Sequence, residues 1–183
     1  MKKKVDYPNI HQGLVDRCID GDRNAQFDIY RLYSTAMYNT CLRITSHISD
    51  AEDVMQEAFF KAFDKIKTYE NKVSFGAWLK RIMVNTAIDF MRKSKPILIP
   101  IEEVREVCVE TESEDSVMPE DVPQLKNAMI KLPRGYRLVI DLFYFEDYSH
   151  DEIAEFLGIS ASTSRSQLAR AKKRLAELLT ELK

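Results

Sequence analysis

The sequence predicts an all-α protein made of two small helical domains joined by a flexible acidic linker. Its 183 residues suffice for two small domains. Apolar residues recur at helical spacing in residues 1–95 and again in residues 124–183. Residues 96–123 instead carry prolines, many carboxylates and little helical periodicity, a composition typical of a flexible segment. We therefore expect domains at 1–95 and 124–183.

The first domain is expected to contain three helices. Residues 22–44 carry apolar side chains at helical intervals with neither proline nor glycine among them. Ser49 and Glu52 have the spacing of a capping box, which predicts a second helix starting near residue 50. A third apolar stripe begins at Phe75 and runs to a basic last turn before Pro96, where a helix would end.

The second domain carries the most specific pattern of the chain. After a helical stretch at 136–143, Ser149 and Glu152 again form a capping box, and Gly158 can end that helix in the left-handed conformation. Ser160 can cap a following helix, whose inner stripe would be Leu168, Ala171, Leu175, Leu178 and Leu179. This arrangement predicts a helix-turn-helix, which presents its second helix to the major groove of DNA.

The exposed side of that second helix is rich in groups that bind bases or phosphates. Its candidate DNA-binding residues are Ser162, Thr163, Arg165, Ser166, Gln167, Arg170 and Lys173. A simply solvated polar face is the alternative. The two caps, the glycine turn and five basic residues between Arg165 and Arg174, with no acid among them, favour DNA binding.

Other function classes are disfavoured by composition. The cysteines and histidines are too scattered along the sequence for a disulfide framework or a metal site, so no cofactor is expected. They are Cys18, Cys41, Cys108, His11, His47 and His150. We find no catalytic constellation and no glycine-rich phosphate loop after a strand, so we do not expect an enzyme. Without a secretion signal or an apolar stretch long enough to span a bilayer, the expected location is the cytoplasm.

Three stretches resemble one known protein family. Residues 50–63 (DAEDVMQEAFFKAF), 75–82 (FGAWLKRI) and 85–93 (NTAIDFMRK) closely resemble the second conserved region of bacterial RNA polymerase sigma factors. The helix-turn-helix resembles their fourth region. With both regions in this order and a short linker, the chain resembles the extracytoplasmic-function group over residues 22–95 and 124–179.

The resemblance implies a dissociable subunit that directs core RNA polymerase to a two-part promoter and is not itself an enzyme. Its implied partners are promoter DNA, the clamp helices and flap of the polymerase, and an anti-sigma factor. The residues implied to bind the polymerase are Asp50, Asp53, Gln56, Glu57 and Lys61. Compensation of a helix dipole is an alternative reason for the acids among them.

In this family, the recognition helix reads the promoter element near minus thirty-five. The first domain opens and captures the element near minus ten. The resemblance places that capture in the loop 67–74 and the following helix, at Tyr69, Asn71, Lys72, Arg81, Asn85, Arg92 and Lys93. Trp78 shares the spacing of the apolar stripe and is expected in the core. Ser164 and Gln167 depart from the common family pattern, so the base preference of other members does not transfer.

The acidic linker has two interpretations, a solubilising tether or, as the family resemblance implies, a segment that threads the basic channels of the polymerase. Two rival functions are also open. A stand-alone helix-turn-helix regulator would bind duplex DNA as a dimer without polymerase. An interaction protein that mimics a sigma factor would titrate an anti-sigma factor without directing initiation.

Overall fold

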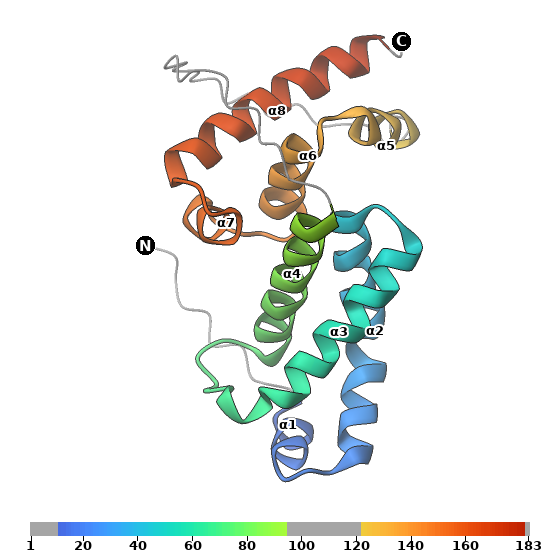
Figure 1. Ribbon diagram of the computed structural model, residues 1–183, viewed down its shortest axis with the longest axis vertical. Helices are drawn as coiled ribbons and strands as arrows, with labels where there is room; N and C mark the ends of the chain where they lie inside the picture. The colour runs from blue at the N-terminus through green and yellow to red at the C-terminus, as the bar shows by residue number, and fades with distance from the viewer. Residues whose placement is uncertain (1–10, 95–121, 182–183) are drawn as a thin grey trace. The chain divides into compact units, whose positions relative to one another are not determined.

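The computed structural model describes residues 11–94 and 122–181 (Figure 1). Every regular element in these two ranges is helical, which confirms the all-α prediction. The chain divides into two units, residues 1–94 and 95–183, and each has its own buried core. Most of the predicted acidic linker lies outside the described residues. Within the described ranges, no helix combines the length and apolarity needed to span a bilayer.

The N-terminal unit is a helical bundle. Its elements are α1 (Gln12–Ile19), α2 (Arg23–Thr45), α3 (Ile48–Asp64), the short 3-10 helix η1 (Ile66–Thr68) and α4 (Phe75–Ser94). Helices α2, α3 and α4 pack on one another in pairs, and α1 packs on α2 (Figure 1). The side chains buried between them recur at helical spacing and include Ala25, Ile29, Val54, Ala58, Leu79, Met83, Ala87 and Met91.

Two details of this unit differ from the sequence prediction. Helix α1, which has eight residues, was not predicted, because so short a segment shows little periodicity. The predicted capping box at Ser49 and Glu52 is wrong. Helix α3 begins at Ile48, two residues before the predicted start near residue 50, and His47 is its N-cap without a side-chain cap bond. Ser46 takes a left-handed conformation (φ 65°) and His47 an extended one, so Ser49 already lies inside the first helical turn.

The C-terminal unit is built around the last helix. Its elements are α5 (Val122–Lys131), α6 (Arg134–Ile140), the π-helical segment η3 (Asp141–Phe145), α7 (His150–Leu157) and α8 (Ala161–Glu181). Helix α8 packs against α5, α6 and α7. The buried side chains include Leu138, Val139, Leu142, Ile153, Leu168, Ala171 and Leu178. Helices α7 and α8 therefore share one core, as a helix-turn-helix requires.

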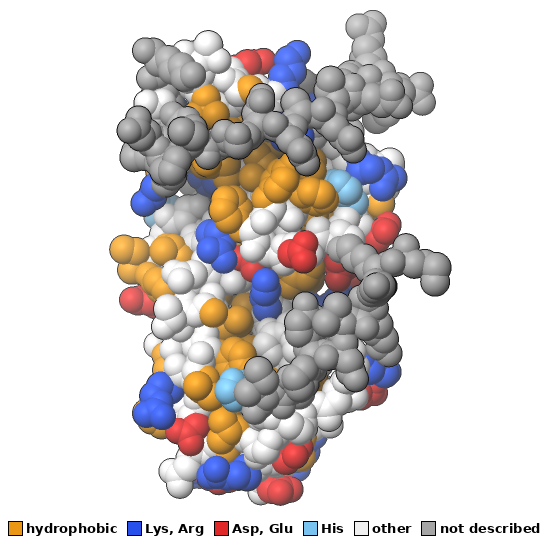
Figure 2. Space-filling model, turned by 180° about the vertical axis from the view of Figure 1, so that it is seen from behind, with side chains coloured by type: hydrophobic (Ala, Val, Ile, Leu, Met, Phe, Trp, Pro, Cys, Tyr) orange, Lys and Arg blue, Asp and Glu red, His pale blue; other side chains and the backbone are white. Residues whose placement is uncertain are grey.

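Apolar side chains also reach the surface in both units, and Figure 2 shows them in orange among charged groups on one face. The large exposed ones are Phe27, Tyr30, Leu32, Ile48, Phe60, Val73, Ile130, Tyr144 and Phe145. Leu32 is one of the apolar residues that recur at helical intervals in residues 22–44, yet it is 49% exposed. Scattered exposed apolar residues are common, so each needs a second observation before it indicates a partner.

Candidate functional site

The helix-turn-helix has the local geometry that its sequence predicts. The Ser149 hydroxyl and backbone N–H donate to the Glu152 carboxylate at 2.7 and 2.9 Å, and the Glu152 N–H returns a longer bond of 3.4 Å. Gly158 ends α7 with φ 66°. Ser160 then caps α8, since its Oγ accepts the Thr163 N–H at 3.0 Å. The predicted capping box and both predicted helix starts are confirmed.

A side-chain hydrogen bond joins the starts of the two helices. His150, the first residue of α7, lies 2.8 Å through Nδ1 from the Oγ of Ser164 in the first turn of α8. Its ring also stacks on Phe143, with centroids 4.8 Å apart and an angle of 25°. Burial, helped by the charge of Arg165, lowers the pKa of His150, while Asp151 acts in the opposite direction. The first turn of α8 is thus held by its cap and by this bond.

The outer face of α8 carries most of the predicted DNA-binding residues. Arg165, Ser166, Lys173 and Ser162 are exposed, and Thr163 and Arg170 are half-buried. Gln167 does not belong with them, because it is only 3% exposed. The residues at 164, 167, 168 and 171 follow helical spacing and face the core. The prediction placed Gln167 by its side-chain chemistry, and its angular position on the helix corrects that placement.

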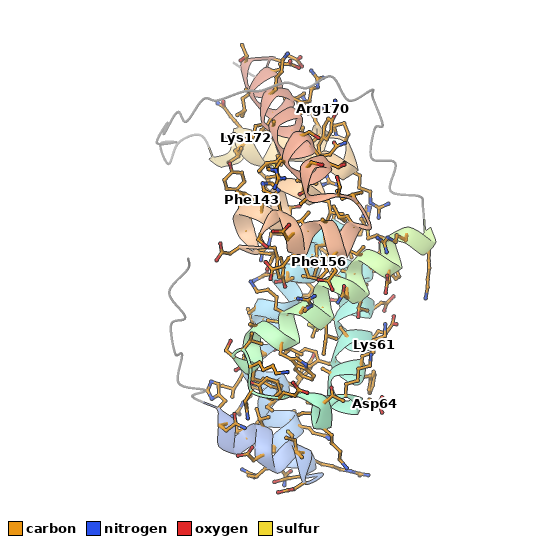
Figure 3. All side chains as sticks on the ribbon, turned by 90° about the vertical axis from the view of Figure 1, so that its left-hand side faces the viewer. Lys61, Asp64, Phe143, Phe156, Arg170 and Lys172 are labelled. Atoms are coloured by element: carbon orange, nitrogen blue, oxygen red, sulfur yellow. The ribbon has the colours of Figure 1, made fainter. Side chains whose placement is uncertain are left out.

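The hydroxyls of this face are already engaged in local bonds. Ser162 Oγ and Thr163 Oγ1 each lie 2.8 Å from Ser160 Oγ, and the Ser166 hydroxyl donates to the Thr163 carbonyl at 2.9 Å. Farther along α8, Arg174 pairs with Glu177 at 2.9 Å and with Glu181 at 3.6 Å. Figure 3 labels two of the remaining cations of α8, Arg170 and Lys172. Long cationic side chains therefore provide the reach of this face toward an anionic partner.

In the loop between η1 and α4, one residue that was predicted to contact DNA, Tyr69, is buried. Tyr69 is only 7% exposed, its ring contacts those of Phe75 and Trp78 at 5.5 and 5.4 Å, and its hydroxyl donates to the Val73 carbonyl at 2.7 Å. Tyr69 thus supports the loop from inside, which corrects its predicted place as a base-stacking surface. Trp78, which was expected in the core, is half-buried and packs in the same aromatic cluster.

The tip of that loop is presented to solvent. Asn71 has a left-handed backbone (φ 56°), and Lys72 beside it forms an ion pair with Glu70. Asn71 and Lys72 are both exposed. Ser74 then caps α4, as its Oγ accepts the Ala77 N–H at 3.2 Å. The loop thus has a short polar tip, which lies between the buried Tyr69 and the Ser74 cap of α4.

Helix α4 adds a polar and basic stripe beyond the loop. Asn85, Arg92 and Lys93 are exposed, and Arg81 is half-buried. Arg81, Asn85 and Arg92 are spaced by four and seven residues and so share one face of the helix. Asp89 lies 3.8 Å from Arg92 and offsets part of this positive charge. This stripe is continuous in sequence with the loop tip and suits an extended anionic ligand.

Helix α3 offers a face of a different kind. Asp53, Gln56 and Glu57 are exposed, Asp50 is half-buried, and half-buried Lys61 pairs with Glu57 at 2.6 Å. Figure 3 shows Lys61 and Asp64 on this helix. Dipole compensation acts within the first helical turn, so it explains Asp50 but not Gln56 or Glu57. The rest of the face is the polar, exposed side of an amphipathic helix, where a partner can bind.

Phe60 was missed by the sequence prediction although it lies on the same face of α3. It follows Asp53 by seven residues and Glu57 by three, which is helical spacing, and it is 74% exposed. The inner stripe of α3 uses its neighbour Phe59 instead, which is 3% exposed. The sequence did contain a signal for Phe60, because this apolar residue has the same helical spacing as the polar residues of the face. A large apolar group surrounded by polar ones is typical of a protein interface.

Comparisons with known proteins identify both regions of the chain. Residues 29–97 match the model for Sigma-70 region 2, and residues 124–175 match that for Sigma-70 region 4. The ECF RNA polymerase sigma factor SigW of Bacillus subtilis (strain 168) is 34% identical over 173 residues, which cover 88% of this chain and 92% of SigW. RNA polymerase sigma factor SigV of the same strain is 33% identical over 181 residues, covering 99% and 98%.

A solved structure is also similar to this chain in fold. It contains the sigma factor RpoE in complex with the anti-sigma factor NepR, from Bartonella quintana, and RpoE is 26% identical to this chain. The match has a TM-score of 0.57 and covers 84% of this chain and 95% of that one. From the two region models and from the extent of its identity with SigW and SigV, the chain belongs to the sigma-70 family, in the extracytoplasmic-function group of RNA polymerase sigma factors.

Proposed function

We propose that the two units of this sigma factor divide promoter recognition, and that α3 binds the core polymerase. The single observation that carries the proposal is the capped helix-turn-helix whose second helix exposes cationic side chains. It occurs in one chain with the region 2 bundle, in the order that the two family models have. Such a subunit selects the start site and leaves bond formation to the polymerase, so we infer that it is not an enzyme.

Helix α8 is proposed to bind the upstream element near minus thirty-five. An α-helix fits the major groove with its N-terminal residues toward the base edges. The residues proposed for this contact are Ser162, Thr163, Arg165, Ser166, Arg170 and Lys173. Gln167 is left out because it is buried. Arg165 is the strongest candidate for a base contact, since it is exposed and directly follows the anchored Ser164.

The loop tip and the outer stripe of α4 are proposed to bind the element near minus ten. Asn71 and Lys72 would contact a base or phosphate at the tip, and Arg81, Asn85, Arg92 and Lys93 would follow the strand along the helix. Tyr69 is left out as a contact. Its proposed role is to hold the tip through its hydroxyl bond to the Val73 carbonyl.

The outer face of α3 is proposed to bind the clamp helices of the largest polymerase subunit. It combines Asp50, Asp53, Gln56, Glu57 and Lys61 with the exposed ring of Phe60. A buried aromatic anchor with a polar rim is the arrangement that gives most protein interfaces their affinity. We place the complex in the cytoplasm with the polymerase, and the flap as a contact of the C-terminal unit.

An anti-sigma factor is proposed as a further partner. The similar sigma factor RpoE was solved bound to the anti-sigma factor NepR. A protein that covers the exposed faces of α3 or α8 would prevent polymerase or DNA from binding, which is a direct physical route to inhibition.

The experiment that tests the proposed function is transcription in vitro with purified components. Core polymerase alone and core polymerase with this protein are supplied with a library of promoter fragments, including the DNA upstream of its own gene. We expect discrete start sites only when the protein is present. A stand-alone regulator would bind duplex DNA without producing starts, and a mimic would bind an anti-sigma factor without producing starts.

A further inference from the structure

We propose that His150 and Ser164 act together as positioning residues that orient the first turn of α8 for DNA, and that they do so through their mutual hydrogen bond. This inference rests on the proposed role of α8 at the upstream element. Neither residue is proposed to touch DNA. They act on the affinity for DNA through Arg165, which directly follows Ser164 in the chain.

The geometry that supports this inference is a short series of contacts. The Phe143 ring in η3 stacks on the His150 ring, and His150 Nδ1 lies 2.8 Å from Ser164 Oγ. Ser164 is completely buried, so no solvent competes for its hydroxyl. One end of the series is the half-buried Phe143 ring in η3, and the other is the backbone turn that carries Arg165. The start of α8 is therefore tied to the body of the unit.

A directional bond is needed there because the first turn of α8 buries little apolar surface. Its residues 161–163 are exposed or half-buried, and the apolar stripe of the helix begins only at Leu168. The Ser160 cap fixes the local backbone of the turn, and among the described residues its side chain bonds only to Ser162 and Thr163 of the same helix. The His150 bond is a cross-helix bond, and it sets the rotation of the turn about the helix axis. A buried hydrogen bond of this kind specifies one geometry where packing alone allows several.

Variants of the full-length protein, assembled with core polymerase, separate the parts of this contact. Ser164→Ala removes the hydroxyl, and His150→Phe keeps a ring to stack on Phe143 but removes the nitrogen. His150→Asn gives up the ring but keeps a hydrogen-bonding atom attached to Cγ, where Nδ1 is attached in histidine. The DNA probe is a duplex selected from a randomised library by the wild-type holoenzyme, and a second probe has its upstream element scrambled.

We expect Ser164→Ala and His150→Phe each to weaken binding to the selected duplex about tenfold. The double variant should lose no more than either single one, because both remove the same bond. His150→Asn should recover most of the affinity. Binding to core polymerase and to the scrambled probe should stay at wild-type levels in all of them.

Three results would overturn the inference: unchanged affinity in both single variants, losses that multiply in the double variant, or His150→Asn as weak as His150→Phe. If Ser164→Ala unfolds, the comparison of His150→Phe with His150→Asn decides the matter by itself. Failure of the proposed function is distinguishable, because the wild-type protein would then bind no core polymerase, or its mixture with core polymerase would select no duplex.

Discussion

Arg165 and Arg170 are the long cationic side chains in the half of α8 that follows the Ser160 cap. We predict that replacing either with alanine weakens upstream-element binding by about 1–3 kcal/mol if it contacts a base. The measurement is the affinity of the holoenzyme for the selected duplex. Arg174→Ala is the matched control, since that guanidinium pairs with Glu177 and Glu181, and it should change the affinity little. Unchanged binding by both test variants would show that another face of α8 meets DNA.

His150 predicts a pH dependence of stability. Its ordinary pKa of 6.5 is lowered in the folded protein, so the unfolded chain binds the proton more readily. The free energy of unfolding should therefore decline as the pH falls from above 6.5 through the folded pKa. Thermal unfolding of the wild type and of His150→Asn at about pH 7.5 and about pH 5.5 measures this effect. A pH response as steep in His150→Asn as in the wild type would contradict the prediction.

At the scale of elements, two serines with the same sequence pattern have different roles. Ser149 caps α7 and completes a capping box, whereas Ser49 lies inside the first turn of α3. We predict that Ser149→Ala lowers the free energy of unfolding by about 1 kcal/mol and that Ser49→Ala changes it by less than about 0.5 kcal/mol. Urea unfolding followed by circular dichroism measures both variants. Equal losses would mean that Ser49 also stabilises its helix start.

The face of α3 predicts an effect on assembly without an effect on folding. Replacing Asp53 and Glu57 together with lysine should lower the affinity for core polymerase at least tenfold, because both carboxylates are exposed and would meet the partner. The thermal midpoint should hardly change, since the Glu57–Lys61 pair is a surface pair worth about 0.3–0.5 kcal/mol. Asp20→Lys, at the exposed end of α1, is the control for charge alone. A matching loss of stability would instead support a packing or dipole role.

At the scale of the whole molecule, the separate cores predict separate unfolding. Leu142 is fully buried in the C-terminal unit, so Leu142→Ala should destabilise that unit by about 2–5 kcal/mol. Trp78 is the single tryptophan and lies in α4, so its fluorescence follows the N-terminal unit alone. Its unfolding transition should stay at the wild-type midpoint while the circular dichroism shows an earlier transition. A shift of the Trp78 signal would show that the two units unfold together.

The same variant separates the two proposed functions of the molecule. Leu142→Ala should lose binding to the upstream element at temperatures where its C-terminal unit is unfolded, and should keep binding to core polymerase through α3. Loss of both activities at once would mean that the C-terminal unit supplies much of the affinity for polymerase.

Much of the fold followed from the sequence, because its signals are local. Helical spacing marked α2, α3, α4 and α8, and the capping box with Gly158 marked both ends of α7. Each of these signals depends on residues within one or two turns, so no distant contact is needed to interpret them. The family followed from the resemblance of residues 50–93 and of the helix-turn-helix to known sigma factors.

The tertiary structure decided which side of each helix or loop is exposed and can contact a partner. Ser49 does not cap α3, because the left-handed turn at Ser46 starts the helix two residues earlier than predicted. Gln167 and Tyr69 have the chemistry of contact residues but are buried, whereas Phe60 has the chemistry of a core residue and is exposed. The bond between His150 and Ser164 joins residues fourteen positions apart. Burial and such contacts depend on which elements pack together, so only the folded chain determines them.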